Sequence, residues 1–330
     1  MKLATFSPSS GVTRIGIVHS GDGRVFDLTA AAARAAGDQS AFSDMLALMS
    51  AGSRALDSAY ELLARYGGDP EINHAIGSVA LLSPLPVPSS IRDFVSFPGH
   101  ILNAPAGLRT LATTIGVPLA AAPNASAAAE IPEVYRRQPN YYKGNRFTVV
   151  GHDAEVRRPR DSGYLDYELE FGVFIGTPGM NVPRARAMDH VFGYSIFNDF
   201  SARDIQVREM GGMTGPGKSK DFDTGNAIGP WIVTADDIKD PYALKMTSRV
   251  NGETWCSGKS SGMVHTFADM IAYVSRDEPL HPGEFFGSGT VGGGTGMEIS
   301  RYLQDGDVIE LEVEGLGILR NRVVGTPVAQ

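Results

Sequence analysis

The first part of the chain combines short apolar runs with residues at helical spacing. Residues 13–19 and 24–28 are rich in apolar and β-branched residues, a pattern that predicts two short strands. After residue 40, apolar residues recur three or four positions apart, which predicts amphipathic helices. Those residues are Phe42, Met45, Leu46, Met49, Leu56, Tyr60 and Leu63. The pattern therefore predicts a small α/β unit with helices packed on a sheet.

A proline-rich segment separates this unit from the rest of the chain. Residues 82–88 read LSPLPVP, and three alternating prolines favour an extended backbone that cannot continue a helix. We expect a domain boundary here, with a small N-terminal domain at residues 1–83 and a larger one at residues 84–330.

The larger part is predicted to be rich in β-structure. Residues 167–175 and 309–314 alternate like strands, and residues 231–234 form a further short strand candidate. One clear helix is predicted at residues 266–275, where Phe267, Met270, Ile271 and Val274 share a face. Strands and helices do not alternate regularly, so the predicted fold class is α+β, β-rich, and not a doubly wound parallel sheet.

Composition and charge narrow the function. The chain has 29 Lys and Arg against 37 Asp and Glu, a net charge of −8, which argues against nucleic acid as a partner. No apolar run approaches the ~18 residues that cross a bilayer, so no membrane partner is expected. The N-terminal sequence does not resemble a signal peptide. With one cysteine, Cys256, no internal disulfide can form. We expect a cytoplasmic protein.

Acidic residues fall at positions that could converge. Glu168 and Glu170 are two apart in a predicted strand, so their side chains share one face. Asp199 follows the apolar stretch 191–197, where a buried strand could end. For these residues a solvated strand face and a capped helix start remain open alternatives. Arg203 and Gln206 are spaced to share one face of a helical turn.

A further acidic residue, Asp93, and the imidazole of His100 flank an aromatic, proline-containing segment. Carboxylate oxygens suit Mg²⁺, Mn²⁺ or Ca²⁺, and the candidate set is Asp93, Glu168, Glu170 and Asp199. No Cys or His cluster has zinc spacing. Residues 287–292 fit the GxGxxG pattern, but strand-like segments follow it, so dinucleotide binding is not expected.

These motifs occur together in one order. They are the D-Y-E-L-E-F strand, the run N-D-F-S-A-R-D-I-Q, K-D-F-D at residues 220–223, G-S-G-T at residues 287–290 and the ending D-G-D-V to L-R-N. From roughly residue 90 to 325 the sequence resembles the fumarylacetoacetate hydrolase family. The resemblance implies a mixed β-sandwich roll around a metal site, often in a homodimer, with residues 1–83 as the small extra domain that many members carry.

The resemblance also implies residue roles. The four carboxylates match the family's metal ligands, with Mg²⁺ expected first and Mn²⁺ or Ca²⁺ as alternatives. His100 matches the catalytic histidine of the fumarylacetoacetase branch, and Glu298 the carboxylate that orients it. Lys220 matches a catalytic lysine that stabilises the oxyanion, although its pattern alone is compatible with a solvated charge. Positions that match substrate contacts are Arg109, Tyr142, Arg203, Gln206 and Thr290.

The implied function is metal-dependent hydrolysis of a C–C bond in a small anionic β-dicarbonyl acid, of acylpyruvate or fumarylacetoacetate type. Alternatives on the same metal–enolate site are decarboxylation, hydration or isomerisation of a 2-oxo acid. A non-catalytic binding protein is a third alternative. Residues 207–220 depart from the fumarylacetoacetase branch and are rich in Gly and Met, which leaves the substrate open. We expect residues 207–217 to form a mobile lid over the site.

Overall fold

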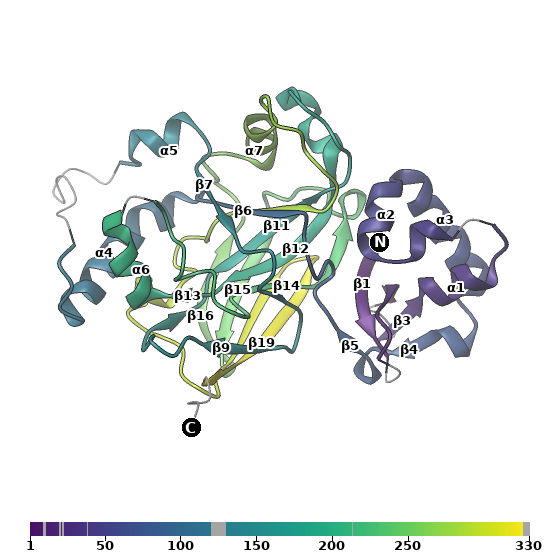
Figure 1. Ribbon diagram of the computed structural model, residues 1–330, viewed down its shortest axis with the longest axis horizontal. Helices are drawn as coiled ribbons and strands as arrows, with labels where there is room; N and C mark the ends of the chain where they lie inside the picture. Colours follow the sequence, from purple (N-terminus) through teal and green to yellow (C-terminus); the bar gives the residue numbers. More distant parts are fainter. Residues whose placement is uncertain are drawn as a thin grey trace.

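The computed structural model describes residues 1–8, 11–19, 21, 23–37, 39–119, 130–212 and 214–325. Figure 1 shows two parts, with the N-terminal elements on the right and the larger, strand-rich part on the left. The mixed, strand-rich α+β class agrees with the prediction.

The N-terminal part places short helices beside a small antiparallel sheet. Its elements are β1 (Lys2–Ser7), β2 (Arg14–His19), β3 (Arg24–Asp27), α1 (Leu28–Arg34), η1 (Ser40–Phe42), α2 (Met45–Ala51), α3 (Ser53–Tyr66), η2 (Pro70–Ile72), β4 (Asn73–Ala75), η3 (Ile76–Ser78) and β5 (Ala80–Leu81). The side chains of Asp27 and Asp44 cap α1 and α2 by accepting backbone N–H bonds.

Of the face predicted for α3, Leu56 and Leu63 pack against the hydrophobic core, but Tyr60 does not. Tyr60 is 45% exposed, and Leu56 and Leu63 are only partly buried. The helix instead buries Ala55, Ala59 and Leu62. Small alanine side chains let α3 lie close to α1, and that close approach decides which face is covered.

The larger part contains β6 (Ser90–Phe94), α4 (Pro98–Thr114), α5 (Glu133–Arg137), β7 (Tyr141–Gly144), β8 (Val149–Val150), β9 (Glu155–Arg158), β10 (Leu165–Asp166), β11 (Leu169–Ile175), η4 (Arg184–His190), β12 (Val191–Asp199), β13 (Ser201–Ala202), α6 (Arg203–Glu209), η5 (Met210–Gly212), β14 (Asn226–Thr234), η6 (Ala235–Asp237), β15 (Lys245–Val250), β16 (Glu253–Lys259), α7 (Phe267–Val274), β17 (Glu284–Gly287), η7 (Gly296–Ile299), β18 (Val308–Val313) and β19 (Gly317–Gly325). The predicted helix at residues 266–275 is α7, and a Thr266–Asp269 capping box fixes its start.

One large sheet runs through both parts. Its strand order is β4-β3-β2-β1-β14-β12-β11-β17-β6-β7. The junction is an antiparallel pairing of β1 with β14, in which Leu3 faces Ile232. A second sheet of order β16-β15-β18-β19-β9 shares a hydrophobic core with β11 and β12, which gives the sandwich arrangement. The N-terminal residues therefore extend the main sheet, and whether residues 1–83 behave as a separate domain stays a prediction.

Strand register places the acidic residues near one another. β11 and β12 pair antiparallel, with Leu169 opposite Asn198, so Glu168 and Glu170 lie beside the end of β12 at Asp199. β17 pairs parallel with β6, with Gly287 opposite Asp93. A Cβ atom on Gly287 would lie 2.3 Å from Asp93 Oδ1, so only glycine fits there. Gly287 of the GxGxxG segment thus leaves space for the Asp93 carboxylate.

Among the described residues, no helix combines the length and the apolar character that crossing a bilayer requires.

Candidate metal and catalytic site

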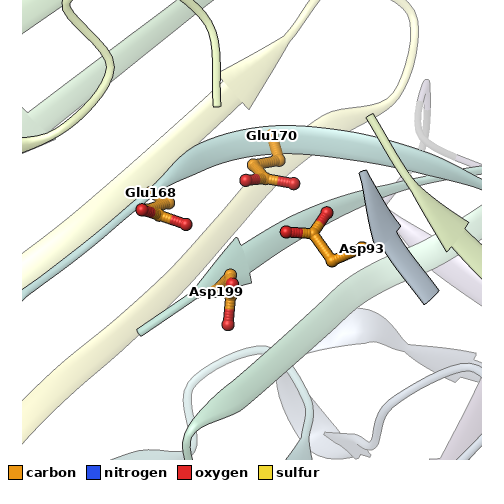
Figure 2. Close-up of side chains that lie close together, drawn as sticks. All are labelled: Asp93, Glu168, Glu170 and Asp199. Atoms are coloured by element: carbon orange, nitrogen blue, oxygen red, sulfur yellow. The ribbon is translucent and has the colours of Figure 1, made fainter. Parts of the chain in front are cut away.

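Four carboxylates from three strands and an adjoining segment meet in the interior. Asp93 belongs to β6, Glu170 to β11 and Asp199 to the end of β12, while Glu168 directly precedes β11. Each offers an oxygen within 4.8 Å of the others, and all four side chains are buried. Figure 2 shows the four side chains close together, with Glu168 and Glu170 above Asp93 and Asp199 in this view. The predicted oxygen-ligand set is therefore brought together by the fold, and neither a solvated strand face nor a helix cap describes it.

The electrostatics of the cluster call for a cation. Burial and then the charge of Asp199 hold the pKa of Asp93 well above its usual range, and burial and then Asp93 do the same for Glu170. Burial also raises the pKa of Asp199 to about 6, against the opposing effect of Lys220. Asp93 Oδ1 and Asp199 Oδ1 have no hydrogen-bond partner among the described residues. Unpartnered buried oxygens on acidic side chains fit a divalent, oxygen-liganded metal.

Lys220 is part of this cluster and is not a solvated charge. Its side chain is 3% exposed, and Nζ lies 2.7 Å from Glu168 Oε2 and 2.5 Å from Asp199 Oδ2. Burial lowers the pKa of Lys220, but the two carboxylates outweigh burial and raise it. For Glu168, burial acts to raise the pKa, but the charges of Lys220 and Arg203 outweigh burial and lower the pKa below its usual range. Lys220 and Glu168 are therefore both charged at neutral pH.

Arg203 and Gln206 lie together on α6, as their spacing predicted. Arg203 Nη1 donates to Gln206 Oε1 at 2.8 Å and Nη2 donates to Glu168 Oε1 at 2.7 Å. The third contact is from Nε to Asp166 Oδ2 at 2.8 Å. Gln206 thus keeps its amide Nε2 as a donor beside the cavity that it lines.

Asp166 was quoted within a motif but given no role in the sequence analysis. It is fully buried and accepts bonds from Arg203, from the Thr295 hydroxyl and from the backbone N–H groups of Gly296 and Met297. The sequence did contain a pattern that could have pointed to Asp166, because residues 166, 168 and 170 are acidic and follow the period of two of a strand.

His100 and Glu298 are brought into contact. His100 Nδ1 lies 2.6 Å from Glu298 Oε1, and Glu298 Oε2 accepts from Gly293 N at 2.8 Å. His100 lies in the first turn of α4 and not in a loop, because that helix begins at Pro98. The Glu298 carboxylate beside Nδ1 favours the tautomer of His100 that carries its proton on Nδ1, which leaves Nε2 able to accept a proton.

The remaining predicted substrate contacts divide into two groups. Tyr142 Oη donates to Asp199 Oδ2 at 2.5 Å and Thr290 Oγ1 donates to Glu170 Oε1 at 3.0 Å, and both residues line the cavity. Burial and then Asp199 hold the pKa of Tyr142 well above its usual range, so the phenol is neutral. Arg109 is half-buried on α4 and is not among the described residues that line the cavity. Its substrate role stays a prediction.

A cavity of about 790 Å³ opens over the carboxylates. Asp93, Glu168 and Glu170 line the cavity together with Lys220 and Arg203, and one face of α4 forms an apolar wall of Ile101, Ala104, Pro105 and Leu108. Met210, Thr214, Gly215 and Pro216 also line it. The segment predicted as a lid therefore borders the cavity, although Met213 lies outside the described residues and its motion stays a prediction.

Comparison with known proteins identifies the family. Residues 113–324 match the model "Fumarylacetoacetate (FAA) hydrolase C-terminal". The chain belongs to the fumarylacetoacetate hydrolase family. A Burkholderia multivorans protein with the name "Putative hydrolase" is 33% identical over 96% of both chains. Human mitochondrial oxaloacetate tautomerase is 38% identical over 57% of this chain and 60% of that protein.

Solved structures of the family share the fold. Fumarylacetoacetate hydrolase from Exiguobacterium antarcticum superposes with a TM-score of 0.72 at 26% identity, covering 99% of this chain and 100% of that one. Maleylpyruvate hydrolase from Sphingobium sp. SYK-6, in complex with manganese(II) and pyruvate, gives 0.70 at 22% identity, with the same coverage. These relatives are named as two hydrolases and a tautomerase, so membership supports an enzyme without fixing its reaction.

Proposed function

We propose that the protein is a metal-dependent hydrolase that cleaves a C–C bond in a small β-dicarbonyl acid of acylpyruvate type. The observation that carries this proposal is the His100–Glu298 pair beside the carboxylate cluster. Hydrolysis needs a base for water, whereas decarboxylation does not.

The residues that would hold the metal are Asp93, Glu168, Glu170 and Asp199. A bound Mg²⁺ or Mn²⁺ would supply Lewis acidity toward the oxygens of a 2-oxo acid. Oxygen ligands fit both ions, and the related fold that holds manganese(II) with pyruvate is compatible with either. Lys220 offsets one negative charge of the set, and Arg203 shares its charge between Glu168 and Asp166.

His100 would then act on water. Glu298 fixes Nδ1, so Nε2 can remove a proton from a water molecule in the cavity. The oxygen of that water forms a bond to the acyl carbonyl carbon. The adjacent C–C bond breaks, and its electron pair moves to the pyruvate part as an enolate. A proton then returns to that carbon, and a carboxylic acid and pyruvate leave.

Polar groups around the floor would orient the substrate. The Gln206 amide and the Tyr142 hydroxyl lie on the cavity wall as neutral groups, and Lys220 supplies positive charge near a developing oxyanion. The apolar wall on α4 can receive the acyl portion.

The direct test is turnover of an acylpyruvate in water enriched in ¹⁸O. One labelled oxygen in the released carboxylic acid, with pyruvate in equal amount, is the expected result. An acylpyruvate left intact would refute hydrolysis. The methyl ester of the same acid is the matched compound, and slower turnover of the ester is expected if the free carboxylate is bound.

A second candidate is tautomerisation of a 2-oxo acid such as oxaloacetate. The resemblance to the human tautomerase over 189 residues favours it. Tautomerisation moves one proton without breaking a C–C bond, so enzyme-dependent conversion between enol and keto oxaloacetate with no enzyme-dependent release of pyruvate would identify it.

A further inference from the structure

We infer that Asp166 is a positioning residue that joins the carboxylate cluster to the His100–Glu298 pair. The inference rests on the proposed function in so far as His100 is taken as the base. No substrate contact is assigned to Asp166, which is fully buried and is not among the described residues that line the cavity.

One side of Asp166 reaches the carboxylate cluster. Its Oδ2 accepts from Arg203 Nε at 2.8 Å, and the same guanidinium donates through Nη2 to Glu168 Oε1 at 2.7 Å. A planar guanidinium held at two points cannot rotate without breaking a charged hydrogen bond. Asp166 therefore sets the orientation in which Arg203 meets Glu168.

The other side of Asp166 reaches the turn that carries Glu298. Asp166 Oδ1 accepts from Gly296 N at 2.8 Å, and Oδ2 accepts from Met297 N at 3.0 Å and from Thr295 Oγ1 at 2.5 Å. These N–H groups belong to the first turn of η7 (Gly296–Ile299), so one carboxylate fixes the start of that turn.

Glu298 lies within the same turn, one residue beyond Met297. Its carboxylate contacts His100 of α4, a helix that also packs against η7. A shift of η7 would move Glu298 relative to the imidazole, and misplacement of a partner group by about 1 Å can cost 10²-fold in rate. Asp166 thus acts on His100 through the backbone of η7.

Three variants test this inference. Asp166→Asn removes the charge but keeps the shape. Thr295→Val removes one hydroxyl of the same network and leaves no buried charge unpaired, so it decides the matter if Asp166→Asn does not fold. Asp204→Asn is the matched control, because Asp204 is also a buried aspartate. Among the described residues its carboxylate accepts bonds from Ser162, Gly163 and Ile205, all outside the cluster.

The first readout is spectroscopic and independent of activity. The Nδ1–H proton of His100, held by Glu298, should give a downfield proton resonance that disappears in His100→Ala. We expect this resonance to move upfield or broaden in Asp166→Asn and Thr295→Val, and to stay in Asp204→Asn. An unchanged resonance in both folded network variants overturns the inference.

The second readout is a double-mutant cycle in turnover. Asp166→Asn should lower kcat about 10–100-fold, the usual effect of losing an outer-shell partner, with KM changed far less. In the His100→Ala background the same change should cost clearly less, because only its effect through Arg203 and Glu168 remains. Full additivity overturns the inference. If His100→Ala is fully active, the proposed hydrolysis fails, and the resonance alone decides the role of Asp166.

Discussion

The Nδ1 atom of His100 lies 2.6 Å from Oε1 of Glu298, although 198 residues separate them in the chain. The imidazole is part-buried at the start of α4, and the carboxylate is held in place by Gly293 N. A histidine with one nitrogen fixed by a carboxylate has its other nitrogen available as a base.

Replacement of His100 by alanine should therefore slow turnover without releasing the metal. We expect a fall in kcat of about 10²–10⁴, the usual range for a positioned base. Manganese binding, followed by isothermal titration, should stay near normal because His100 is not among the four ligands. His190→Ala, on η4, is the control. Loss of metal from His100→Ala would show that the role is misassigned.

Removal of the divalent metal should abolish activity and weaken the fold. Four buried carboxylates without a cation repel one another, so chelation should lower the melting temperature, and Mg²⁺ or Mn²⁺ should restore both properties. Glu170→Gln should weaken Mn²⁺ binding about 10-fold or more, whereas Glu312→Gln, at a half-buried residue of the second sheet paired with Arg249, should not change it. Full activity in metal-free protein would contradict this prediction.

Lys220→Met should destabilise the metal-free protein. The substitution leaves Glu168 and Asp199 buried without their shared ammonium, and breaking a buried pair costs about 3–5 kcal/mol in the free energy of unfolding. Urea denaturation after chelation measures this loss. Exposed Lys259→Met is the control. A change below about 1 kcal/mol, the usual size for a surface pair, would mean that the carboxylates are protonated instead.

The single thiol should report on unfolding. Burial raises the pKa of Cys256 to about 11, so its thiol stays protonated and almost unreactive at pH 8 and gains reactivity only as the pH rises toward that value. Labelling with iodoacetamide should be slow in the native protein and fast in urea. Fast native labelling at pH 8 would contradict the buried position, and the same assay checks whether each variant above has folded.

The prediction that residues 207–217 form a lid can be tested where Glu209 anchors this segment. The Glu209 carboxylate accepts from Gly217 N at 3.1 Å and from Ser219 Oγ at 2.6 Å, which ties the end of α6 to the residues before Lys220. Glu209→Ala should speed tryptic cleavage after Lys218 and raise KM, and a 2-oxo acid ligand should slow cleavage of the wild type. Exposed Glu61→Ala on α3 is the control. Equal cleavage rates with and without ligand would argue against a lid.

The acidic site could be predicted because its signals are local. Glu168 and Glu170 obey the period of a strand, and Asp199 follows the apolar residues of β12. The contact between His100 and Glu298 has no local signal, and only the family resemblance suggested it. Asp166 was missed because the importance of its carboxylate depends on η7, which lies about 130 residues further along the chain. The pairing of β1 with β14 could not be predicted either, because either edge strand of an isolated hairpin can pair with a further strand.

The pairing of β1 with β14 also bears on how the protein unfolds. β1 covers part of one edge of β14, and residues of both lie in one hydrophobic cluster with Phe197 of β12. Loss of the N-terminal strands would uncover that edge and leave unpaired backbone groups that invite intermolecular strand addition. The two parts of the chain should therefore melt in one cooperative transition, and a fragment beginning after the proline-rich segment should aggregate before it binds metal.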